Sequence, residues 1–373
     1  MDYYFKRLSK RINRIRTDKR YKLEWINDTN WDGQTMLNGK HITIGIESSC
    51  DETAAGIVAD GREMLSNIIS SQISIHTKFG GVVPEIASRH HLENINDVID
   101  RALKEAGVSL NEVDLIGVTY GPGLVGALLI GVATAKMIAY AKNIPLVGVN
   151  HMHGHIAANY IEHKDLKPPF MGLIVSGGHT NIVDIEDYNT CKIIGETRDD
   201  AAGEAFDKVS RVIGLGYPGG PKMDRSARDG NKDAIDFKRV WLEKGSYDFS
   251  FSGIKTAALN YINNERQSGR DIDINDFSAS FQEAVVDVIT KKALDACIEF
   301  KRDKLVLSGG VAANTRLGEL LIERARKAGI EVFKPSKILC TDNGAMIASS
   351  AYYESLKGNY SNLKLDAVPG LEI

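Results

Sequence analysis

The stretch Met171–Thr180, MGLIVSGGHT, places an apolar run directly before a turn of one serine and two glycines. The stretch Leu305–Asn314, LVLSGGVAAN, repeats this arrangement much later in the chain. Glycines let the backbone approach a ligand closely, and free N–H groups at a turn or a helix start bind phosphate oxygens. Two strands that each end in Ser-Gly-Gly therefore favour a nucleotide cleft.

Apolar strands and helical segments alternate around these two turns. We expect strands at 41–46, 114–119 and 146–149, and helices at 84–106, 126–141 and about 276–300. The strands are short and rich in β-branched residues, whereas Pro84 suits the first turn of a helix. This alternation predicts α/β layers with ligands at the strand ends.

Three of the nine histidines lie within His151–His155, directly after an apolar run. In a helix, residues four apart share a face, so His151 and His155 would point together and His153 away from them. Such a pair could bind a metal if a carboxylate completed the site, or it could be a buried hydrogen-bonded pair. Asp342 is a candidate carboxylate, although Asp342 or Thr341 could simply cap the last helix.

Other polar segments predict parts of the same cleft. Glu47–Ala55 forms a predicted hairpin tip dense in hydroxyls and carboxylates, where a plain turn would favour Asn-Gly. The acidic segment Asp199–Lys208 is expected to be a helix with carboxylates on more than one face. Asp207 lies thirteen residues before Gly220 in a glycine-rich loop, so both could line the cleft.

Charge is distributed unevenly along the 373 residues, whose net charge is −3. Residues 1–40 hold ten Lys/Arg against five Asp/Glu, which leaves 36 and 44 for the remainder. An acidic body binds nucleic acid poorly unaided, because affinity depends largely on neutralising phosphates. The four cysteines are scattered, which indicates a reducing compartment, and no uninterrupted apolar run reaches the roughly 18 residues of a membrane span.

The basic arm could bind RNA, act as a targeting peptide or be dispensable. Met36 precedes the first strand closely and could be the biological start. We hypothesise that residues 1–35 are not needed for folding or catalysis, which activity after their deletion would test.

Eight collinear motifs resemble the TsaD family of tRNA adenosine threonylcarbamoyltransferases. They are 46–54, 151–155, 176–180, 199–208, 217–221, 250–257, 308–314 and 341–348. The resemblance covers residues 41 to about 360, and Gly344, where many relatives have Ala, is read as a conservative difference. It implies an actin/Hsp70/sugar-kinase-like (ASKHA) fold with two related lobes around a nucleotide cleft.

The resemblance also implies a domain organisation. Residues 1–40 would be an extension, 41–168 the first lobe with the metal motif, and 169–340 the second lobe with the nucleotide loops. Residues 341–373 would form a closing helix that packs back across the lobes, followed by a tail.

The implied enzyme is an acyltransferase that moves a threonylcarbamoyl group from threonylcarbamoyl-AMP to the N6 amine of the adenosine beside the anticodon, in tRNAs that read A-starting codons. One divalent metal, iron or alternatively zinc, would be held by His151, His155 and Asp342. The adenylate would be bound by Ile174, Val175, Ser176, Gly177, Gly178, Asp207, Gly220, Asp224 and Asn314. Asp51 and Glu52 would lie beside the transferred group, and one of them would be the general base.

The implied partners are tRNA and, in bacteria, a TsaB-like paralogue and a TsaE-like ATPase. Mitochondrial relatives would act as homodimers. We expect no membrane association and a cytoplasmic enzyme, with the mitochondrial matrix as the alternative.

Three other functions compete with this interpretation. A helical zinc peptidase needs a Glu after the first His, but Met152 occupies that position. A sugar kinase or ATPase uses hydrated magnesium, for which two imidazoles have no role. A non-catalytic scaffold of an RNA-modifying complex would not depend on His155.

Overall fold

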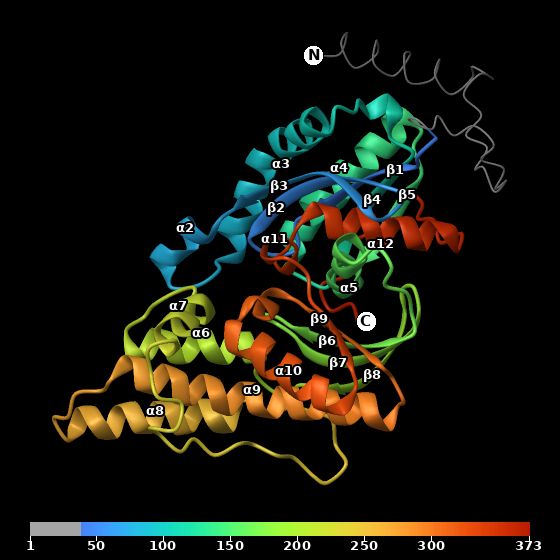
Figure 1. Ribbon diagram of the computed structural model, residues 1–373. Helices are drawn as coiled ribbons and strands as arrows, with labels where there is room; N and C mark the ends of the chain where they lie inside the picture. The colour runs from blue at the N-terminus through green and yellow to red at the C-terminus, as the bar shows by residue number, and fades with distance from the viewer. Residues whose placement is uncertain (1–38) are drawn as a thin grey trace, which may run out of the picture. The chain divides into compact units, whose positions relative to one another are not determined.

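The first sheet contains five strands in the order β3-β2-β1-β4-β5 (Figure 1). This computed structural model describes residues 39–373, so the predictions for residues 1–38 lie outside the described residues. The strands are β1 (Ile42–Glu47), β2 (Glu52–Ala59), β3 (Glu63–Ser71), β4 (Leu115–Gly121) and β5 (Leu146–Asn150). Because β1 pairs in parallel with β4, and β4 with β5, their carboxyl ends meet at one sheet edge.

A second five-stranded sheet repeats this topology in the order β10-β9-β6-β7-β8. Its strands are β6 (Phe170–Val175), β7 (Thr180–Asp187), β8 (Thr190–Glu196), β9 (Lys304–Ser308) and β10 (Glu331–Phe333). β6 pairs antiparallel with β7 and parallel with β9, as β1 does with β2 and β4. This pairing brings the two Ser-Gly-Gly turns to the same sheet edge and confirms the predicted α/β class.

The helices lie close to where the hydrophobic pattern predicts them. The long ones are α3 (Pro84–Ala106), α4 (Val125–Lys142), α5 (His151–Glu162), α6 (Ala202–Ile213), α7 (Gly219–Ala227), α8 (Ser252–Gln267), α9 (Ile274–Glu299), α10 (Thr315–Ala328) and α12 (Gly344–Leu356). The short ones are α2 (Ile73–His76), η2 (Thr77–Phe79), η3 (Leu110–Glu112), η4 (Gly310–Ala313) and α11 (Lys337–Cys340). Helix α3 has the predicted bounds, and α9 begins two residues early.

Helices cover both faces of each sheet. α3 and α4 pack on one face of the first sheet; α6, α9 and α10 cover one face of the second, and α8 packs against α6 (Figure 1). α5 contributes Ala158 to a core with first-sheet strands and Ile156 to a core with second-sheet strands. α5 therefore lies between the sheets, where α12 packs against it.

Helix α12 approaches β1 and β2 until the backbones touch, and glycines permit this approach. A Cβ on Gly45 would lie 2.2 Å from backbone atoms of Gly344 and Ala348. A Cβ on Gly344 would lie 2.2 Å from the backbone N of Gly56, so the interpretation of Gly344 as a conservative difference from Ala is wrong for this backbone. The contact fixes the start of α12 against the first sheet.

One local prediction is wrong, and one open alternative is excluded. Asp199 and Asp200 precede α6 instead of lying within it, and Asp199 accepts a hydrogen bond from the Phe251 backbone N at 2.8 Å. The last helix is capped by Asn343, whose side chain accepts a hydrogen bond from its first turn at 2.9 Å. Asp342 is therefore free of the capping role.

Within residues 39–373, α4 alone is long and apolar enough to cross a membrane by length and composition. Its sequence includes two lysines, so it contains no uninterrupted apolar run as long as a membrane span. Its inner side packs on β4 and α3, as in a core helix, so this one helix is weak evidence for a span.

We predict that Gly45→Ala destabilises the protein, because the new methyl group overlaps the α12 backbone, which cannot rotate away. Overpacking of this kind costs about 1–3 kcal/mol. Thermal unfolding should show a lower Tm than for Gly370→Ala, a control position with no neighbouring atom within 4 Å of the added Cβ. Equal Tm values for the two variants would contradict the backbone contact.

Candidate active site

Helix α5 brings His151 and His155 to the same side, as the spacing predicts. The Asn150 side chain caps the helix by accepting a hydrogen bond from its first turn at 2.9 Å. The two imidazole rings lie with their centroids 4.6 Å apart. His153 faces elsewhere, with its Nε2 3.4 Å from Cys191 Sγ, and burial lowers the pKa of His153 to about 4.

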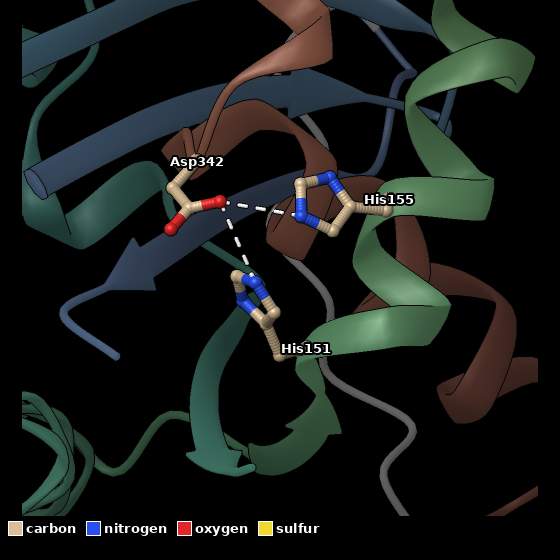
Figure 2. Close-up of side chains that lie close together, drawn as sticks. All are labelled: His151, His155 and Asp342. Atoms are coloured by element: carbon tan, nitrogen blue, oxygen red, sulfur yellow. Dashed lines mark ion pairs between the residues drawn. The ribbon is translucent and has the colours of Figure 1, made fainter. Parts of the chain in front are cut away.

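Asp342 completes a cluster with these two histidines from the turn between α11 and α12 (Figure 2). Its Oδ1 lies 3.4 Å from His151 Nε2 and 3.2 Å from His155 Nε2. One ligand atom from each of the three residues lies within 4.8 Å of the others. The structure therefore brings together the three residues predicted as metal ligands.

The chemistry of the cluster fits a divalent cation. Both ring nitrogens of His155 are buried; Nδ1 has no hydrogen-bond partner among the described residues, and Nε2 has only the ion-pair contact with Asp342, an arrangement that is unfavourable unless another group binds there. Burial lowers the pKa of His151, but the Asp342 and Glu47 carboxylates outweigh it and raise this pKa well above its usual value. The position thus favours positive charge, and two imidazoles with one carboxylate suit zinc or iron.

A cavity of about 780 Å³ opens beside the cluster. His151 and Asp342 line one part of it, and the turn Ser176–Gly178 lines another. The predicted carboxylates Asp51, Glu52 and Asp207 also line this cavity. Segments of both sheets therefore meet at one cavity. Its lining combines side chains that can bind a metal with a glycine-rich turn that can bind phosphate.

The loop between β1 and β2 is shorter than predicted, because β2 already begins at Glu52. Glu52 accepts a hydrogen bond from Ser71 Oγ at 3.0 Å. Burial, with the nearby carboxylates of Asp51 and Asp342, raises the pKa of Glu52 well above its usual value. Cys50 lies in the same loop, but burial raises the pKa of its thiol, so it is a poor nucleophile near neutral pH.

The residues predicted to bind the adenylate do not all reach this cavity with their side chains. Ile174 and Val175 are fully buried in β6 and hold the turn that follows. Asp207 Oδ1 accepts hydrogen bonds from the backbone N atoms of Gly219 at 2.6 Å and Gly220 at 3.4 Å. Asp207 thereby fixes the start of α7, and burial raises its pKa.

Asp224 lines a second cavity, of about 520 Å³, and Asn314 lies behind its wall. Asp224 lines it and accepts hydrogen bonds from the backbone N and Oγ1 of Thr315 at 3.0 and 2.9 Å. Asn314 donates to Gln282 Oε1, also in the lining, at 2.7 Å and caps α10. Of the predicted adenylate residues, Ser176, Gly177, Gly178 and Asp207 therefore line the first cavity and Asp224 lines the second.

The chain matches known proteins over most of its length. Residues 63–349 match the TsaD family model, described as tRNA N6-adenosine threonylcarbamoyltransferase. The protein of that name from Clostridium perfringens is 59% identical over 334 residues, which are 90% of this chain and 98% of that protein. Its counterpart from Clostridioides difficile is 58% identical over 332 residues, 89% of this chain and 98% of that protein. The chain belongs to the TsaD family. The predicted resemblance and the acyltransferase class are confirmed.

Solved structures share the fold of this TsaD-family chain at low identity. HypF from T. kodakarensis has a TM-score of 0.57 at 14% identity, over 87% of this chain and 49% of that protein. Component A of the Acidaminococcus fermentans (R)-2-hydroxyglutaryl-CoA dehydratase has a TM-score of 0.51 at 15% identity, over 85% and 99%. Both have ASKHA-type folds, so the predicted fold is confirmed.

Glu47, the last residue of β1, belongs to the polar segment predicted to line the cleft, but the sequence pattern assigned it no role of its own. It is fully buried, and its Oε2 lies 3.0 Å from His151 Nδ1 and accepts a hydrogen bond from Thr119 Oγ1 at 2.6 Å. Burial opposes its ionisation, but His151 outweighs this effect and lowers the pKa of Glu47. A carboxylate bound to the far nitrogen of a metal-ligating histidine orients the ring. The available signal was one acidic residue at the end of an otherwise apolar strand.

His91 anchors the loop that carries the predicted catalytic carboxylates. Its Nε2 lies 2.9 Å from the Cys50 carbonyl oxygen and its Nδ1 2.8 Å from Thr53 Oγ1. Burial lowers the pKa of His91, so the ring is neutral at neutral pH. The adjacent His90 instead contacts Glu93 at 3.1 Å, so these two histidines do not act as a pair.

We predict that Glu47→Gln weakens metal binding about 10- to 100-fold, because the His151 ring loses its anionic partner. Competition with a chromophoric chelator would measure the affinity of the purified protein for Zn²⁺ or Fe²⁺. Glu63→Gln, at a half-exposed ion pair with Lys40, is the control. Unchanged metal affinity in a folded Glu47→Gln protein would rule out this role.

Proposed function

We propose that this chain transfers the threonylcarbamoyl group from threonylcarbamoyl-AMP to the N6 amine of the adenosine beside the anticodon in tRNAs that read A-starting codons. Membership of the TsaD family supports the reaction. The structural observation that supports it best is the single cavity lined by His151, Asp342 and the turn Ser176–Gly178. A turn that can bind phosphate, next to side chains that can bind a metal, suits an adenylated donor.

We assign His151, His155 and Asp342 to one divalent cation, iron by family resemblance and zinc as the alternative. When bound, this cation would counter negative charge on the oxygens of the donor. The chain's own part is to hold the three side chains in place. Glu47 orients the His151 ring, and the contact between Gly45 and α12 holds the segment that carries Asp342.

The adenylate part of the donor would extend along the start of α7. Backbone N–H groups of Gly177 and Gly178, in the turn that follows Ile174 and Val175, suit its phosphate, whereas the Ser176 N–H donates to the His179 carbonyl oxygen. Next along the nucleotide, Asp207 and Gly220 would contact the part beyond the phosphate. Asp224 and Asn314 would contact the end farthest from the phosphate, at the second cavity. The carboxylates are hydrogen-bond acceptors of the kind that ribose hydroxyls require.

The remaining chemistry is attack by a weakly nucleophilic amine on an activated carbonyl. The bond between N6 and the carbamoyl carbon forms, the bond from that carbon to the phosphate oxygen breaks, AMP leaves, and N6 loses a proton. The donor is a mixed anhydride, so no serine or cysteine nucleophile is required. Asp51 or Glu52 would take the proton, and we favour Glu52 because its raised pKa makes it a stronger base.

Bacterial relatives favour the bacterial partners, a TsaB-like paralogue and a TsaE-like ATPase, over a mitochondrial homodimer, and a cytoplasmic location. An apolar stripe supports a protein partner. It consists of Leu92 on α3 with Val125, Leu129, Met137 and Tyr140 on α4, each between 43% and 72% exposed. A paralogue of the same fold would present an equivalent helix pair to this stripe.

We also propose the domain organisation that the family resemblance implies. The first lobe would comprise residues 41–168 and the second 169–340. Residues 341–373 would form the closing segment, and residues 1–40 an extension to the catalytic body. The two five-stranded sheets, which span 42–150 and 170–333, support the division into lobes.

We predict that His155→Ala lowers turnover by about 100-fold or more, because the metal loses a ligand. The assay combines tRNA, threonine, bicarbonate, ATP and an adenylate synthase, with and without TsaB- and TsaE-like proteins, and detects threonylcarbamoyladenosine by mass spectrometry. His153→Ala, on the same helix but facing away, should remain active. Full activity of His155→Ala would favour the scaffold function, and no product from the wild type in any combination would overturn the proposal.

We predict that Glu52→Gln lowers kcat about 10²- to 10⁴-fold with little change in the KM for the donor, because the amide cannot accept the proton. Glu204→Gln, another lining residue, is the control because its carboxylate is paired with Lys208. The wild type and Glu52→Ala, each incubated with peptides, test the competing peptidase function. Metal-dependent peptide cleavage by the wild type that is absent in Glu52→Ala would support the peptidase function.

A further inference from the structure

Arg211, on α6, lines the large cavity beside the metal-ligand cluster. Its Nη2 donates a hydrogen bond to the Gly80 carbonyl oxygen, and no carboxylate of the described residues lies within ion-pair distance of it. A guanidinium has five N–H donors, so four remain available for a ligand. Arg211 is thus a cation on the cavity wall that makes no direct ion pair among the described residues, although its charge acts on the nearby Asp207 carboxylate.

The other charged groups of the lining leave Arg211 as the available cation. Lys208 lies 2.7 Å from Asp200 and 2.6 Å from Glu204, so two carboxylates already neutralise it. His151 already faces the carboxylates of Glu47 and Asp342, and the other carboxylic acids of the lining are Asp51, Glu52, Asp207 and Asp342. A negatively charged ligand group would be repelled over most of this cavity and attracted near Arg211.

The lining that includes Arg211 also has an apolar part. The apolar residues are Ile73, Val82, Pro122 and Leu124, which come from the first-sheet side of the chain. Arg211 belongs to the second-sheet side and reaches Gly80 on the first, so it lies where the two sides meet. A cation next to small apolar side chains is suited to an amino acid with a short side chain.

We propose that Arg211 binds the carboxylate of the threonyl group and makes the enzyme selective for acyl donors derived from an amino acid. This inference rests on the proposed function. The donor carries two separate negative groups, and the proposed role of the Ser176–Gly178 turn accounts only for the phosphate. The planar fork of arginine matches a carboxylate with two parallel hydrogen bonds, and the threonine methyl group would pack on the apolar residues.

The test compares two donors, threonylcarbamoyl-AMP and its uncharged analogue in which the threonyl carboxylate is a carboxamide. In the wild type, kcat/KM for the carboxamide should be about 10- to 100-fold lower, the loss expected for one charge-assisted contact. In Arg211→Met, kcat/KM for the acid should fall to a similar extent, while the carboxamide loses little further activity. Arg211→Lys should recover part of the preference for the acid.

Arg266→Met is the matched control, because Arg266 also donates to a backbone carbonyl, that of Val212, at 2.7 Å and does not line the cavity. It should keep the wild-type preference for the acid. The inference is overturned if the wild type uses both donors equally well, or if Arg211→Met affects both donors alike. An increase only in the KM for tRNA would instead assign Arg211 to a tRNA phosphate.

The two proposals fail in distinguishable ways. If wild-type enzyme forms no modified adenosine from threonylcarbamoyl-AMP, the proposed function itself is wrong. If product forms and the preference for the acid survives in Arg211→Met, only the role of Arg211 is wrong.

Discussion

Asp342 reaches the two histidines because α12 lies in backbone contact with β1 and β2. The contact depends on Gly45, Gly56 and Gly344, where any side chain would overlap main-chain atoms. Backbone cannot move aside as a flexible side chain can, so this packing sets the position of α12 within narrow limits. Because Asn343 caps the helix immediately after Asp342, that position is transmitted to the carboxylate.

Negative charge is concentrated around the cavity, and this determines what the site can bind. Glu47 is fully buried against His151, while Asp51, Glu52 and Asp207 face the same hollow. Buried carboxylates are tolerated only with hydrogen bonds or positive partners, and burial raises the pKa of Glu52 and Asp207. An anionic donor therefore needs positive charge near each of its negative groups. A bound cation and the Arg211 side chain can supply it.

Local sequence patterns predicted the helix at His151, the bounds of α3 and the two Ser-Gly-Gly turns, because periodicity and turn chemistry act within a few residues. They failed where tertiary contacts decide, as at Asp199 and Asp200, which bond to a distant segment instead of continuing a helix. The role of Glu47 was missed for the same reason, since its importance comes from a histidine 104 positions later. The family resemblance supplied Asp342, whereas the residue pattern left it as either a cap or a ligand.

The repeated topology explains why the cluster forms between the sheets. Helix α5 follows the last strand of the first sheet, and α11 and α12 follow the last strand of the second, so His151 and Asp342 lie near equivalent positions of two repeats. Because each repeat contributes part of this cluster, its geometry depends on the relative position of the two repeats. Arg62, in the turn after β2, helps to fix it by donating to the carbonyl oxygen of Leu166 after α5 at 2.8 Å and to the Tyr188 hydroxyl of the second sheet at 2.9 Å. The metal cluster and the cavity beside it are thus consequences of how two copies of one fold are held together.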